Sequence, residues 1–166
     1  MRAVPRILVT LVVATTGCVG DVLGESPPSG PSDCDVPAAT GKFTDRGDGT
    51  VGYTAPVIRT VFQKDSPGSD YTWNGANEYC EDLELAGLDW RLPERSELEG
   101  LLVDCPVEGC RMEATFEGSC NYYWASDEEK PGDPDSPRGF TDMGFGGSGF
   151  DGKGYEHAVR CVAKQP

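Results

Sequence analysis

Histidine is almost absent from this sequence, because His157 is the only one among 166 residues. No two cysteines have the C-x2-C spacing, which argues against the usual Cys/His zinc clusters. No motif places a serine or cysteine nucleophile beside His157, so we expect an exposed strand residue there rather than a general base. The sequence therefore predicts a protein that is not an enzyme and has no resident cofactor.

Basic residues are also scarce, with 14 Lys and Arg against 28 Asp and Glu and a formal net charge of −14. A surface this acidic repels phosphate backbones and anionic lipid headgroups. We therefore do not expect nucleic acid as a partner.

The N-terminal apolar run, residues 7–14, is far shorter than the roughly 20 residues that cross a bilayer. It follows Arg2 and Arg6, and this layout is typical of a secretory signal peptide. The sequence therefore predicts export, and a buried N-terminal helix or strand is the alternative.

The run ends in Thr15-Thr16-Gly17-Cys18, which is similar to a bacterial lipobox, with Thr15 where Leu is usual. This predicts a signal peptide over 1–17 and lipidation of Cys18, with the protein anchored at the outer membrane or cell surface. Acyl chains supply such an anchor at about 0.8 kcal/mol per buried methylene. Ordinary cleavage after Gly24, giving a secreted or periplasmic protein, is the alternative.

Seven cysteines occur, and an odd number in an exported protein calls for an explanation. Without Cys18, six remain and can form three bridges, in a compartment where disulfides persist. Spacing alone cannot choose among the 15 pairings of six cysteines. The six are Cys34, Cys80, Cys105, Cys110, Cys120 and Cys161.

The Gly-, Pro- and Ser-rich composition that follows Cys18 predicts a lipidated N-terminus and flexible linker over 18–40, and the folded domain is expected over 41–166. A hairpin with an Asp-Gly turn is expected at 43–53 and a strand at 57–63. A first helix is expected from the N-cap Thr72 to the stop signal Gly87.

The second half of the domain is expected to begin with a helix that has Pro93 in its first turn and Leu98, Leu101 and Leu102 on its buried face. A short strand at 122–126, an acidic loop at 127–137 and a final strand at 155–163 follow in the prediction.

Two groups of side chains are candidates for ligand binding. Tyr122, Tyr123 and Trp124 are candidates for a sugar-stacking platform, although alternation along a short strand buries at least one of its faces. Asp45 and Asp48 are candidates for calcium binding, although Asp-Gly turns usually exist for backbone reasons.

Several blocks of residues together resemble the Lcl C-terminal domain family, whose members are bacterial exported domains. The first is Gly-Lys-Phe-Thr-Asp-Arg-Gly-Asp-Gly-Thr-Val at 41–51. The others, spread over residues 41–163, are Trp73, Ala76, Tyr79 and Cys80; Asp89 to Pro93; Glu97 and Leu98; Tyr123 to Ser126; and Val159 to Val162.

The resemblance implies an α+β, C-type-lectin-like fold, with two helices packed on a twisted, mainly antiparallel sheet and stapled by disulfides. It also implies the pairs Cys80–Cys161, Cys110–Cys120 and Cys34–Cys105. The stretch 138–143 stands for the family's longer penultimate strand, so a thinner sheet is expected there.

The function expected from these features is a non-catalytic binding or interaction module of the cell envelope, displayed on a lipid-anchored tether. Its partner would be an envelope protein or glycan of unknown identity. Two alternatives stay open. The resemblance allows an enzyme of the sulfatase-modifying-factor-like type, which would need reactive cysteines, and the other alternative is a purely structural envelope lipoprotein.

Overall fold

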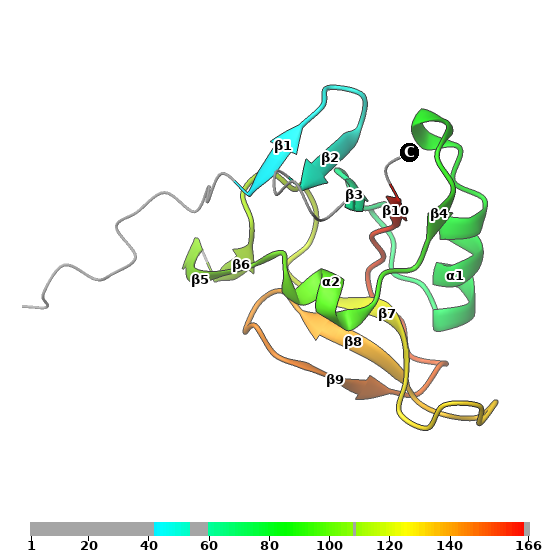
Figure 1. The fold of residues 1–166 in the computed structure, drawn as a ribbon. Helices are drawn as coiled ribbons and strands as arrows, with labels where there is room; N and C mark the ends of the chain where they lie inside the picture. Colours follow the sequence, from blue (N-terminus) through cyan, green and yellow to red (C-terminus); the bar gives the residue numbers. More distant parts are fainter. Residues whose placement is uncertain (1–41, 54–59, 108, 165–166) are drawn as a thin grey trace, which may run out of the picture. The chain divides into compact units, whose positions relative to one another are not determined.

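Ten short strands and two α-helices make up the residues that the computed structural model describes, which are 42–53, 60–107 and 109–164 (Figure 1). The helices are α1 (Trp73–Glu81) and α2 (Arg95–Glu99), with a 3-10 turn at Leu85–Gly87 between them. The strands are β1 (Phe43–Asp45), β2 (Thr50–Tyr53), β3 (Thr60–Gln63), β4 (Trp90–Arg91), β5 (Leu102–Val107), β6 (Cys110–Met112), β7 (Tyr122–Glu128), β8 (Arg138–Asp142), β9 (Ser148–Asp151) and β10 (Val162–Lys164).

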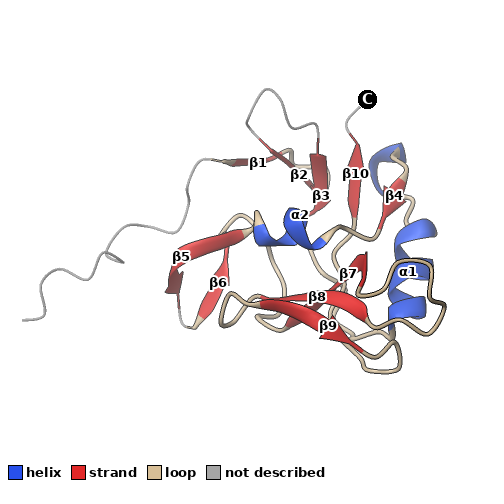
Figure 2. Ribbon diagram, turned by 60° about the horizontal axis from the view of Figure 1, so that its bottom comes forward, coloured by secondary structure: helices blue, strands red, loops and turns tan. Residues whose placement is uncertain are grey.

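The strands form three antiparallel sheets rather than the single sheet that was expected. Their orders are β1-β2-β3-β10-β4, β5-β6 and β7-β8-β9. Helix α1 contacts β4 and β7, whereas α2 contacts β7 and β8, and α2 lies between the two larger sheets in both ribbon views (Figures 1 and 2). The predicted α+β class with mainly antiparallel pairing is confirmed. Neither helix in the described ranges has the length and apolar character to cross a bilayer.

The hairpin β1-β2 and the helix α1 form as the sequence predicts. Residues Phe43 and Tyr53 pair at the open end of the hairpin. The Thr72 hydroxyl caps α1 by accepting a hydrogen bond from the backbone N–H of Gly75. The helix ends at Glu81 rather than at Gly87, because the chain turns into the separate 3-10 segment.

The second helix begins after Pro93, which was expected in its first turn. Glu94 is its N-cap and forms a capping box with Glu97, so Pro93 lies before the helix instead of in its first turn. Glu97 also forms a bidentate pair with Arg91, at 2.8 Å for both contacts. Leu98 is buried as expected.

Strand β7 separates two buried clusters. Its Tyr123 belongs to the cluster around Phe62, Leu98 and Phe116, whereas its Trp124 belongs to the cluster around Trp90 and the Cys80–Cys161 bridge. Successive side chains on a strand point to opposite faces, which explains the division. Both rings are fully buried, so the structure contradicts a three-residue stacking platform and leaves only Tyr122 exposed, at 43%.

The C-terminal segment is strand over a shorter range than the expected 155–163. Only Val162–Lys164 forms β10, between β3 and β4. Before it, His157 makes a single bridge to Tyr71, which precedes α1, and Ala158 makes one to Tyr123 in β7. Each of these bridges is a single pair that does not extend into a ladder, so residues 157 and 158 are not part of a strand.

Two disulfides are present among the described cysteines, and both confirm the pairing that the family resemblance implied. Cys80–Cys161 joins α1 to the segment before β10, and Cys110–Cys120 closes a short loop after β6. The third predicted pair, Cys34–Cys105, stays a prediction, because Cys34 lies outside the described part of the chain, as do the residues predicted as signal peptide and linker.

Candidate ligand-binding groove

A polar groove opens among three segments that are far apart in the sequence, at 66–70, 118–122 and 156–157. It consists of two adjoining hollows of about 290 and 380 Å³, which share Asp70 and Asn121. We call it the Asp70 groove, and its lining residues are Ser66, Pro67, Gly68, Asp70, Gly118, Ser119, Asn121, Tyr122, Glu156 and His157.

The first wall, residues 66–70, is anchored at both ends by hydrogen bonds. The Ser66 backbone donates to the Glu117 carbonyl at 3.1 Å, and its hydroxyl donates to the Val159 carbonyl at 2.8 Å. At the other end, Tyr71 and His157 exchange two backbone hydrogen bonds of 2.8 and 3.0 Å. Because both ends are tied to other elements, the wall has little freedom to move when a ligand enters.

The second wall, residues 117–122, is held from beneath by a fully buried arginine. Arg160 donates to the carbonyls of Gln63 and Glu117 at 2.6 Å each, and also to that of Lys64. Burial lowers the pKa of Arg160, with nearby Tyr123 opposing the shift. The guanidinium thus links β3 to the groove wall.

Gly118 lets this wall pass close to the core. Its φ of +148° is a conformation that side-chain-bearing residues rarely adopt, and a Cβ there would lie 2.6 Å from the Tyr123 hydroxyl and 2.9 Å from the Ser66 Cβ. The Tyr123 hydroxyl donates to the Ser119 carbonyl at 2.9 Å, and the Cys110–Cys120 bridge holds the next residue.

His157 forms the third wall and is buried, so the expectation of an exposed strand residue is wrong. Its ring packs against Trp124, with 4.2 Å between ring centroids, and makes an edge contact with Tyr122 at 5.4 Å. Its Nε2 lies 3.3 Å from an Asp151 carboxylate oxygen. Neighbouring rings and this carboxylate bury it, because the segment bridges Tyr71 through His157 and Tyr123 of β7 through Ala158.

The groove presents hydrogen-bonding groups that other described residues do not use. Within the described ranges, no hydrogen bond or ion pair engages the side chains of Asp70, Asn121 or Glu156, and all three residues are exposed. Tyr122 adds an aromatic surface, with one face stacked on Phe140 at 4.8 Å and 25° between planes. Two carboxylates, an amide and a supported ring can bind a polar ligand that also has an apolar face.

The two calcium candidates accept hydrogen bonds within the β1-β2 turn. Asp45 accepts from the Gly47 backbone and pairs with Lys64, and both contacts lower its pKa. Asp48 accepts from the hydroxyl of Thr50 at 2.6 Å and from its backbone at 3.0 Å, which lowers the pKa of Asp48 as well. In the described part of the chain, no three His, Cys, Asp or Glu side chains gather as a metal site.

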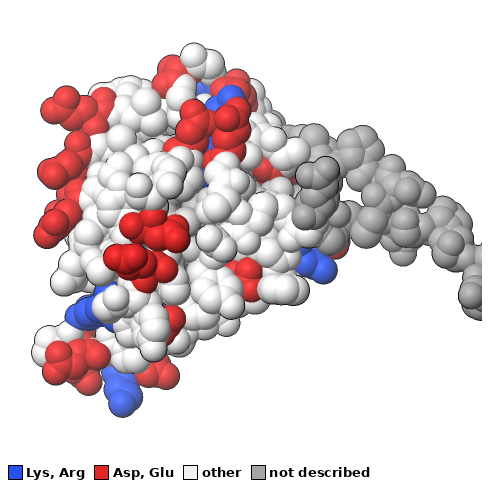
Figure 3. Space-filling model, turned by 180° about the vertical axis from the view of Figure 1, so that it is seen from behind, with Lys and Arg blue, Asp and Glu red and all other residues white. Residues whose placement is uncertain are grey.

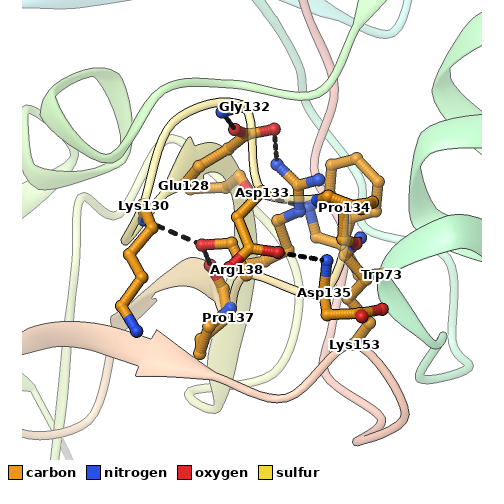
Figure 4. A network of polar contacts seen from close by, with 12 residues as sticks. Trp73, Glu128, Lys130, Gly132, Asp133, Pro134, Asp135, Pro137, Arg138 and Lys153 are labelled. Carbon is orange, nitrogen blue, oxygen red and sulfur yellow. Dashed lines mark hydrogen bonds and ion pairs between the residues drawn. The ribbon is translucent and has the colours of Figure 1, made fainter.

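The acidic segment 127–137 is partly tied down rather than wholly a solvated loop. Its first two residues belong to β7, where Glu128 pairs with Arg138 and accepts from the Gly132 backbone (Figure 4). These contacts lower the pKa of Glu128. The Arg138 guanidinium also lies over the Trp73 ring, 4.3 Å from its centroid. This network fixes the β7-β8 connection.

Acidic side chains outnumber basic ones on the face shown in Figure 3. On the face shown in Figure 3, Asp and Glu form several clusters, whereas Lys and Arg are confined to a few places. One acidic row follows the side that carries α1, where Glu78, Glu81, Asp82 and Glu84 are exposed. The groove carboxylates therefore belong to a generally negative surface, which disfavours anionic ligands.

A comparison with protein families identifies the domain. The family model of the Lcl C-terminal domain matches residues 53–163, which is more than half of the chain. The chain belongs to the Lcl C-terminal domain family. Within this Lcl C-terminal domain lie both described disulfides and the whole Asp70 groove. No curated protein and no solved structure matches the chain significantly.

Sequence reasoning found only one residue of the groove, Tyr122. Asp70, Asn121 and Glu156 lie in loops without a motif, and they meet only because α1, β7 and the C-terminal segment come together. No local signal in the sequence singles out these three residues.

Proposed function

We propose that this Lcl C-terminal domain is a non-catalytic binding module of the bacterial cell envelope, displayed on a lipid-anchored tether, and that the Asp70 groove is its binding site. The observation that carries the proposal is a hollow with anchored walls and exposed polar side chains that have no partner within the described residues. Concave sites with a few convergent polar groups and an aromatic side chain are where proteins bind small ligands.

The state of the cysteines supports binding rather than catalysis. An enzyme of the sulfatase-modifying-factor-like type would need reactive thiols, whereas the four cysteines whose side chains are described all form disulfides. His157, the only histidine, lies beside Asp151 and aromatic rings, and within the described residues no nucleophilic side chain hydrogen-bonds to it.

A C-type-lectin-like architecture is the finer part of the proposal. Two helices beside antiparallel sheets and a bridge from α1 to the last strand region support it. A fold of this kind carries no function by itself, so the groove and not the architecture supports the binding role.

Binding to isolated cell-envelope fractions tests the function. We expect the full-length protein to bind saturably to at least one fraction, and the double variant Asp70→Ala/Asn121→Ala to lose most of this binding. Phe145→Ala, which changes a side chain that is 88% exposed and does not line the groove, is the matched control and should bind normally. Turnover of an envelope component that the double variant abolishes would contradict the non-catalytic role.

A further inference from the structure

The groove's side chains are suited to one chemical class of ligand. We propose that the Asp70 groove binds a short uncharged stretch of glycan, with one sugar ring against Tyr122 and its hydroxyls bonded to Asp70, Asn121 and Glu156. This inference rests on the proposed function, because it names the ligand class of the same site.

Tyr122 supplies the apolar contact that a sugar ring requires. The C–H face of a pyranose is apolar, and an aromatic ring held in place offers a flat surface for it at little entropic cost. Phe140 stacks on one face of Tyr122 and His157 touches it edge-on, so the ring is fixed before a ligand arrives. The 43% of Tyr122 that is exposed includes surface that lines the groove.

The surrounding polar groups match sugar hydroxyls. A hydroxyl both donates and accepts, carboxylates accept, and an amide does both. Asp70 and Glu156 can each accept from hydroxyls, while Asn121 can serve either role. Because Asp70 and Asn121 line both hollows, they can contact two consecutive sugar residues.

The size and charge of the groove further restrict the class of ligand that it can bind. The hollows, of about 290 and 380 Å³, lie near the lower limit of roughly 300 Å³ for small-molecule sites, which suits one sugar residue in each. Two exposed carboxylates repel uronate, sulfate and phosphate groups. An uncharged glycan avoids this repulsion, and its binding should change little with salt concentration.

A glycan array provides the test. The full-length protein, with its disulfides intact, is applied to printed oligosaccharides of uncharged hexoses and N-acetylhexosamines, beside oligosaccharides that carry uronate or sulfate. We expect binding to a subset of the uncharged ones. Calorimetry with the best-bound oligosaccharide should then give the same affinity at low and high sodium chloride concentrations.

Variants assign the binding to the groove. Tyr122→Ala should weaken binding of that oligosaccharide about tenfold, whereas Tyr122→Phe, which keeps the ring, should retain it. Asp70→Ala should also weaken it about tenfold, because a hydrogen bond to a charged group is lost. Phe145→Ala should bind like the unchanged protein, and near-ultraviolet circular dichroism should show that every variant is folded.

Three results would overturn the inference. The first is binding confined to anionic oligosaccharides, and the second is binding of uncharged ones that Tyr122→Ala leaves intact. The third is groove-dependent binding to an envelope fraction that protease treatment destroys, which would contradict a glycan ligand and leave the proposed binding function standing. If no envelope fraction and no oligosaccharide is bound, the proposed function fails as well.

Discussion

At the scale of single residues, Arg160 shows how a charged side chain can organise a protein core. It is fully buried, and its guanidinium satisfies three backbone carbonyls and lies over the Phe116 ring, 4.9 Å from its centroid. Lysine would be a poor substitute, because it lacks the planar fork that reaches several acceptors at once. The residue joins β3 to one wall of the Asp70 groove.

Replacing Arg160 should therefore damage stability. We expect Arg160→Leu to lower the free energy of unfolding by about 3 kcal/mol or more, because buried carbonyls lose their donor. Arg46→Leu, at an exposed position, should change it by less than about 0.5 kcal/mol. Urea unfolding measures the free energy of unfolding of both variants. Equal decreases in this free energy would contradict a stabilising role for the Arg160 hydrogen bonds.

Gly118 is the second residue that supports a wall of the Asp70 groove, because the wall has no room for a Cβ at this position. We expect Gly118→Ala to destabilise the protein by about 1–3 kcal/mol, because the added Cβ meets the Tyr123 hydroxyl and Ser66 in a conformation that favours glycine. Gly68→Ala is the matched control in the same groove, since no atom lies within 4 Å of its Cβ position. Thermal unfolding compares them, and similar midpoints would contradict the close packing of this wall.

At the scale of elements, the β1-β2 turn predicts a pH dependence. The pKa of Asp48 is lowered from its ordinary value of 3.8, chiefly by the Thr50 hydroxyl, so folding favours the ionised carboxylate. Its stabilising contribution is present above the unfolded pKa and is lost as the pH falls through the folded pKa.

The variant Asp48→Asn isolates this contribution. We expect it to unfold at a lower temperature than the unchanged protein at neutral pH, and the difference to disappear at a pH below the folded pKa of Asp48. Melting temperatures of both proteins between about pH 7 and pH 2 check this. A difference that stays constant over the whole range would contradict the role of the carboxylate.

Elements with their own local signals were predictable, and elements set by tertiary pairing were not. Thr72 caps α1 as its sequence position indicates, and the Asp-Gly turn closes the first hairpin. Pro93 was expected in the first turn of α2 but lies before the helix, because the capping box of Glu94 and Glu97 makes Glu94 the N-cap. The final strand was overextended, since no local pattern reports that residues 157 and 158 bridge to different partners.

The Asp70 groove was predictable only in part, because tertiary pairing and not local sequence brings its residues together. An aromatic side chain such as Tyr122 is conspicuous in a sequence, whereas Asp70 and Glu156 are two acids among 28. Alternation along β7 puts Tyr122 and Trp124 on one face and Tyr123 on the other, so it does not indicate that Tyr122 is exposed while Trp124 is core. That difference depends on which elements cover each end of the strand.

At the scale of the whole molecule, the two described disulfides should differ in their effects. Cys80–Cys161 spans 81 residues and Cys110–Cys120 spans 10, so the chain-entropy account assigns them about 4.5 and about 3 kcal/mol. The first also lies in the core, where both sulfur-bearing residues are fully buried.

Paired serine variants test this order. We expect Cys80→Ser/Cys161→Ser to lose most of its cooperative urea unfolding transition, and Cys110→Ser/Cys120→Ser to stay folded with a lower midpoint and weaker binding at the Asp70 groove. The second variant keeps the test informative if the first does not fold. Equal midpoints for the two variants would contradict the ranking.

Export and anchoring are the proposals with the widest consequences, because the location of the protein determines which ligands the Asp70 groove can bind. If Cys18 is lipidated, the full-length protein should fractionate with membranes and dissolve only with detergent, since stable anchoring takes more than one acyl chain. We expect Cys18→Ser to move it to the soluble fraction, and the intact mass of the unchanged protein to show a mature chain that begins at an acylated Cys18. A mature chain that begins after Gly24 would instead identify a secreted or periplasmic protein without an anchor at Cys18.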